Sequence, residues 1–122
     1  MAETINTIIE WHEQTFPDAT LEGQEQKWQD ERKEWEDTSY GSRYELEELA
    51  DMVIVCCGIM RFDYTEGFCY LTSTLCKIGV MAYNGTDLWR AVEKKMAVNR
   101  NRKWDKKNGS YQHICEGEEN VG

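Results

Sequence analysis

The chain has 122 residues, which is enough for one domain with a modest core. Its net charge of −9 argues against a nucleic-acid-binding surface, and its five cysteines, with no Cys-x-x-Cys pair, argue against zinc and disulfide frameworks. No apolar run could span a bilayer and the N-terminus lacks the features of a signal peptide, so we expect a cytoplasmic protein.

The spacing of apolar residues predicts an all-α fold. Helices are expected over four stretches: 3–15, 20–37, 43–62 and 87–104. Thr20 or Asp18 is suited to cap the second helix, and Thr86 or Asp87 the last. The third helix is apolar nearly all round, which indicates the centre of a bundle.

Residues 64–82 fit two structures. Their content of Tyr, Phe, Thr and Val suits a strand, whereas their length and neighbours favour a further helix packed on the bundle, which we predict. The tail after Lys106 is polar and contains glycine, and we expect part of it to be disordered. The predicted domain therefore covers residues 1–106, and the tail covers 107–122.

Two acidic motifs lie on the second and third predicted helices. Glu31 and Glu34 are three residues apart, as are Glu48 and Asp51, so each pair shares one helical face. If the two helices pack together, four carboxylates meet and raise each other's pKa values unless a cation neutralises them. Oxygen ligands favour Mg²⁺ or Mn²⁺. The alternative is that both motifs are solvated helix faces.

The last predicted helix changes character along one face. This face begins with Leu88 and Val92 and continues with Lys95, Asn99 and Arg102. The basic groups suit phosphate oxygens. Alternatively, they interact with the negative end of the helix dipole or form ion pairs with the acidic helices.

The order of these motifs resembles the signature of the MazG-like all-α nucleoside triphosphate pyrophosphohydrolases. Asp30-Glu31-x-x-Glu34 is similar to the family's Glu-Glu-x-x-Glu, with Asp30 where the family has Glu, and Glu48-x-x-Asp51 is similar to its Glu-x-x-Asp. The stretch 95–102 is similar to the family's last-helix element. Residues 11–20 resemble the start of small phage and bacterial members, some of which act on dATP or dGTP.

The resemblance implies a bundle of four to five helices, completed by oligomerisation into a homodimer or homotetramer with sites at subunit interfaces. It implies hydrolysis of an NTP or dNTP to the monophosphate and pyrophosphate. The implied ligands of Mg²⁺, which Mn²⁺ can replace, are Glu31, Glu34, Glu48 and Asp51. Glu31 or Glu34 would orient the attacking water or accept its proton. The implied ligands of the triphosphate are Lys95, Asn99 and Arg102.

A nucleobase would need aromatic and apolar contacts. The candidates near the entrance of the second helix are Trp11, His12, Phe16 and Trp28. Each of them also fits simple core packing, and His12 on an apolar face suits a hydrogen-bonded core residue.

Two other functions fit the sequence. One is a non-enzymatic helical oligomerisation module whose carboxylates lie on the surface, and the other is a phosphoribosyl-ATP pyrophosphohydrolase of the same superfamily. A di-iron carboxylate bundle needs Glu-x-x-His on two helices. His12 and His113 stand in no such motif, so we set that class aside.

Overall fold

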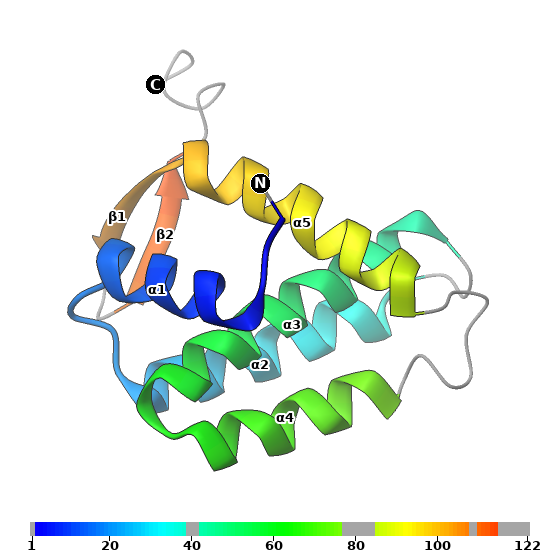
Figure 1. Cartoon of the computed structure of the whole chain (residues 1–122), viewed down its shortest axis with the longest axis horizontal. Coiled ribbons are helices and arrows are strands. Elements are labelled where there is room, and N and C mark those ends of the chain that lie inside the picture. The colour runs from blue at the N-terminus through cyan, green and yellow to red at the C-terminus, as the bar shows by residue number, and fades with distance from the viewer. Residues whose placement is uncertain (1, 39–41, 77–84, 108–109, 115–122) are drawn as a thin grey trace.

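The computed structural model describes residues 2–38, 42–76, 85–107 and 110–114. These residues form five helices and a hairpin of two strands (Figure 1), which confirms the all-α fold. The helices are α1 (Ile5–Thr15), α2 (Leu21–Glu36), α3 (Arg43–Phe62), α4 (Tyr64–Cys76) and α5 (Gly85–Asn101), and the strands are β1 (Lys103–Lys107) and β2 (Ser110–Ile114). Within the described ranges, no helix combines the length and the apolar character needed to cross a bilayer.

Helix α3 is the element on which the other four helices pack. It contacts α1, α2, α4 and α5, and every residue from Met52 to Met60 is buried. Full burial of one large apolar side chain stabilises the folded state by about 1.5–3 kcal/mol. The buried run on α3 therefore supplies much of the stability of the core. Its predicted place at the centre of the bundle is confirmed.

Side-chain caps fix where three helices begin. Thr4 and Thr7 form a reciprocal capping box on α1. Thr20, one of the predicted caps, accepts a hydrogen bond at 3.0 Å from the backbone nitrogen three residues on, and Ser42 does the same for α3 at 3.2 Å. Each such cap is worth about 1 kcal/mol. The caps at Thr20 and Ser42 therefore fix the starts of the two helices that carry the acidic motifs.

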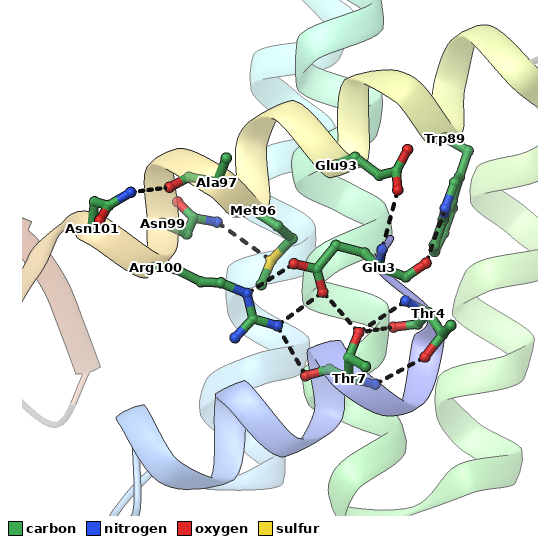
Figure 2. A network of polar contacts seen from close by, with 10 residues as sticks. All are labelled: Glu3, Thr4, Thr7, Trp89, Glu93, Met96, Ala97, Asn99, Arg100 and Asn101. Atoms are coloured by element: carbon green, nitrogen blue, oxygen red, sulfur yellow. Dashed lines mark hydrogen bonds and ion pairs between the residues drawn. The ribbon is translucent and has the colours of Figure 1, made fainter. Parts of the chain in front are cut away.

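The N-terminal segment is tied to α5 by polar contacts. Figure 2 shows the Glu3 carboxylate accepting two hydrogen bonds from Arg100, each 2.8 Å long, and one from Thr7. The Trp89 indole donates to the Glu3 carbonyl oxygen at 3.2 Å, and the Glu3 amide donates to the Glu93 carboxylate at 3.1 Å. These contacts hold the start of α1 against α5 across the front of α3.

Helix α5 differs from its prediction at both ends. It begins at Gly85, so Thr86 and Asp87 lie inside the helix and are not its caps, and it ends at Asn101 rather than at 104. The stretch that follows pairs as β1 with β2, with Trp104 opposite His113 in an antiparallel register.

Trp104 joins the hairpin to the core. Its indole donates to the Asn99 carbonyl oxygen at 3.2 Å, and its ring lies edge-on to Trp11 and Phe16, with centroids 6.1 and 5.0 Å away. The predicted boundary at 106 falls inside this hairpin, and part of the predicted tail forms β2. Residues 115–122 lie outside the described ranges.

The prediction of a helix for residues 64–82 is confirmed as far as Cys76. The Asp63 carboxylate accepts a hydrogen bond at 3.0 Å from the Glu66 amide in the first turn, which separates α4 from α3. Residues 77–84 lie outside the described ranges.

Gly67 provides a test of how closely α3 and α4 pack. A Cβ atom on Gly67 would lie 2.5 Å from the backbone nitrogen of Met60 on α3. We expect Gly67→Ala to lower the free energy of unfolding by about 2 kcal/mol or more, because a core helix must shift to admit the methyl group. Urea denaturation measures the change in the free energy of unfolding.

The control is Gly85→Ala, since nothing lies within 4 Å of a Cβ atom at Gly85. We expect its free energy of unfolding to change by less than about 1 kcal/mol. Equal losses in the two variants would contradict the close approach of α4 to α3.

Candidate metal centre

Three carboxylates meet where α2 and α3 pack together. Glu31 and Glu34 project from the last turns of α2 and Glu48 from the second turn of α3, and one carboxylate oxygen of each lies within 4.8 Å of the other two. Helices α2 and α3 pack against each other, with the late part of α2 beside the early part of α3 at this cluster. Three of the four predicted metal ligands therefore come together.

Two oxygens of this cluster are buried without a partner. The Oε2 atoms of Glu31 and Glu48 are shielded from solvent, and no donor among the described residues reaches either of them. A buried acceptor left in this state costs about 1–3 kcal/mol, and more when it is charged. A cation or a shared proton would satisfy both atoms, so the residues present fit a hard divalent metal ion.

The pKa values in the cluster agree with the burial and close approach of its carboxyl groups. Burial, followed by the negative charge of Asp51, raises the pKa of Glu31 to about 9 and that of Glu48 to about 7. Glu34 is the exposed member of the cluster. Two of the three carboxyl groups are thus held in a state that disfavours their ionised form.

Asp51, the fourth predicted ligand, lies beside the cluster and has its own partner. Its Oδ2 atom is 3.4 Å from the Lys95 ammonium, the predicted phosphate ligand on α5. Burial raises the pKa of Asp51, whereas the charge and hydrogen bond of Lys95 lower it. The negative charge of Asp51 still acts on Glu31 and Glu48, so it shares their electrostatic environment.

The two other predicted phosphate ligands lie at the end of α5. Asn99 is buried at 8% exposure; its side-chain oxygen accepts a hydrogen bond from Arg102 at 3.4 Å, and its carbonyl oxygen accepts from the Trp104 indole. Asn99 therefore shapes the turn that leads from α5 into β1. Arg102 follows the last residue of the helix and is half-buried.

The predicted base-binding side chains fill the core. Trp11, His12, Phe16 and Trp28 are 3–7% exposed, which matches the alternative of core packing. Trp11, His12 and Phe16 pack edge-on to one another, whereas Trp28 faces α4, where its indole donates to Thr74 at 3.1 Å. Contact of these rings with a base stays a prediction.

His12 has a defined hydrogen-bonding role. Its Nδ1 atom lies 3.1 Å from a guanidinium nitrogen of Arg61, which can only donate, so Nδ1 is the acceptor. Burial lowers the pKa of His12 to about 4, and the ring is neutral. Arg61 also donates to the Phe16 carbonyl oxygen at 2.7 Å, so the pair joins the end of α1 to α3.

Lys27, which lies close to the carboxylates, and Trp104, which Lys27 contacts, were not among the predicted site residues. The Lys27 ammonium lies 5.7 Å from the centroid of the Trp104 ring, and its charge interacts with those of Glu31 and Asp51. Lys27 stands one helical turn before Glu31, and this spacing is the sequence signal that places the two side chains next to each other. No local signal marks Trp104, because its position depends on the hairpin.

Comparisons of this chain with protein-family models, with curated proteins and with solved structures found no match.

The pKa values predict how stability depends on pH. Folding raises the pKa of the Glu31 carboxyl group from 4.5 to about 9. The group therefore makes its full contribution to stability at a pH below 4.5, and this contribution is lost as the pH rises through about 9. Without divalent metal, Glu31→Gln should be more stable than the wild type at about pH 9, by about 1 kcal/mol or more. The advantage should shrink towards about pH 5.

Urea denaturation in EDTA at several pH values measures the difference. Glu36→Gln, at the exposed end of α2, is the control and should keep the wild-type pH profile. A Glu31→Gln variant that is less stable than the wild type at high pH would show that the carboxylate is stabilised by something other than a bound cation.

Proposed function

We propose that this protein is a Mg²⁺-dependent nucleoside triphosphate pyrophosphohydrolase of the MazG-like kind. It would hydrolyse the bond between the α- and β-phosphates of an NTP or dNTP and release a monophosphate and pyrophosphate. The observation that carries this proposal is the meeting of Glu31, Glu34 and Glu48 with two of their oxygens buried and unpartnered. A cluster that serves only as a solvated surface has no reason to bury acceptors in this way.

The proposed ligands of the ion are Glu31, Glu34 and Glu48, with Asp51 beside them. Mg²⁺ or Mn²⁺ bound there would neutralise phosphate charge and make a water molecule more acidic. Glu34 is exposed and can reach solvent, so it is our first candidate to orient the attacking water and accept its proton. Glu31 is the alternative, and its burial makes it the better anchor for the ion.

Positive charge for the departing pyrophosphate would come from α5. Lys95 is already directed towards the cluster through its 3.4 Å contact with Asp51. Arg102, whose guanidinium donates to Asn99, lies at the end of the same helix. A cation on this side stabilises the negative charge that develops on the leaving group.

The proposed substrate class is inferred from the sequence motifs of the chain. Their resemblance to small MazG-like proteins favours a purine deoxynucleotide, dATP or dGTP. Trp104, which is only partly buried and lies near Lys27, is our candidate for an aromatic contact with the base.

We also propose that the chain assembles into a homodimer or homotetramer through α4. This helix carries one charged residue, Glu66, and exposes Tyr64, Phe68 and Leu75 at helical spacing, with exposed fractions of 58, 54 and 44%. Two chains of net charge −9 repel each other, so an uncharged apolar face is the surface over which they can approach. Figure 1 places α4 at the opposite edge from α5, so this contact leaves the end of α5 open.

Hydrolysis assays test the proposed activity. We expect release of monophosphate and pyrophosphate from at least one NTP or dNTP with Mg²⁺ or Mn²⁺, and we expect Glu48→Gln to reduce the rate by about 10³-fold or more. Chromatography of a full panel of nucleotides measures both. Glu47→Gln, next to Glu48 but outside the cluster, is the matched control and should retain activity. Release of diphosphate and orthophosphate, or wild-type activity in Glu48→Gln, would contradict the proposal.

Sedimentation tests the proposed assembly. Phe68→Glu places a charge in the middle of the exposed stripe on α4 and should convert the oligomer to a monomer, because each interface would bury at least one unpaired carboxylate. Val98→Glu, at another exposed apolar residue on α5, is the control and should leave the mass unchanged. A monomeric wild type, or a Phe68→Glu variant with wild-type mass, would refute assembly through α4.

A further inference from the structure

Lys27 lies between the carboxylate cluster and the end of α5. It stands one helical turn before Glu31, so both side chains share a face of α2. Its side chain is partly buried and its ammonium lies 5.7 Å from the centroid of the Trp104 ring. A lysine in this position would ordinarily fold back onto the nearby glutamate. Among the described side chains, however, it forms no ion pair within 4.0 Å.

The surroundings of Lys27 contain charges of both signs. Glu31 and Asp51 attract its ammonium, and Arg102 repels it. Burial nevertheless outweighs these charges and lowers the pKa of Lys27. An ammonium group carries three donors. None of them is used on an acceptor among the described side chains, so the group has hydrogen-bonding capacity for a ligand.

Arg102 is brought to the same place by Asn99. The Asn99 side chain accepts from Arg102 at 3.4 Å, and the Asn99 carbonyl oxygen accepts from the Trp104 indole at 3.2 Å. The turn after α5 thus sets a guanidinium and an aromatic ring beside Lys27. Two cations held near each other repel, and an anion bound between them removes that repulsion.

We propose that Lys27 and Arg102 together bind the phosphate chain of the substrate, with the Trp104 ring as the wall of this subsite. This assignment rests on the proposed function and names the groups that hold the anionic part of its substrate. Phosphate oxygens are strong acceptors for both an ammonium and a guanidinium.

The subsite has a consequence for specificity. An ammonium and a guanidinium recognise phosphate oxygens and carry no preference among bases. A substrate with a shorter phosphate chain offers fewer oxygens to span the distance from the carboxylate cluster to Lys27 and Arg102. The protein should therefore bind inorganic tripolyphosphate, which has no base or sugar, and bind orthophosphate much more weakly.

Calorimetric titration with tripolyphosphate in the presence of Mg²⁺ tests this subsite without relying on turnover. Lys27→Met should weaken binding about tenfold or more, because a charge-assisted contact is lost, and Lys27→Arg should restore most of it. Lys33→Met, an exposed lysine on the same helix, is the matched control and should bind as the wild type does. Mn²⁺ affinity, measured separately without phosphate, should change by less than about threefold in Lys27→Met.

Three outcomes would overturn the assignment. They are a wild type that binds no tripolyphosphate, a Lys27→Met variant that binds it as tightly as the wild type, and a Lys27→Met variant that loses Mn²⁺ binding to the same degree as tripolyphosphate binding. The last result would show that Lys27 supports the carboxylates rather than the phosphate chain. Because none of these readouts involves hydrolysis, a failure of the subsite is distinguished from a failure of the proposed activity.

Discussion

The site proposed for this protein depends on one constraint, the mutual repulsion among carboxylates that are held together at the junction of α2 and α3. Glu31, Glu34 and Glu48 place carboxylate oxygens within 4.8 Å of one another, and the Oε2 atoms of Glu31 and Glu48 are buried without a partner among the described residues. Such an arrangement raises the free energy of the metal-free protein at neutral pH. It persists because the packing of the bundle holds the two helices together, and a bound cation would turn the same repulsion into affinity.

The core supplies the energy that holds this arrangement. The nine residues from Met52 to Met60 are buried, and α3 packs against every other helix. The cluster lies just before this buried run, so the core fixes the position of the helix that carries Glu48. The same rigidity fixes Asp51, one turn later, where it meets Lys95 from α5. The polar centre is therefore preorganised by apolar packing outside it.

Local periodicity predicted the helices and the acidic cluster, but not the contacts made by the end of the chain. Glu31 and Glu34 could be paired from sequence because a spacing of three has one meaning on a helix. The pairing of Asp51 with Lys95 joins residues 44 positions apart and follows only from how α5 packs on α3. Likewise, Trp104 was predicted at the end of the last helix, but it lies in β1 with its ring against Trp11 and Phe16, a contact across the fold that local periodicity does not reveal.

The most direct test of the account is to locate a metal ion. Crystals grown with Mn²⁺ and measured by anomalous scattering should show a peak at coordination distance, about 2.0–2.3 Å, from carboxylate oxygens of Glu31, Glu34 and Glu48. Ordered side chains of these three residues with no anomalous peak between them, at saturating Mn²⁺, would contradict the account.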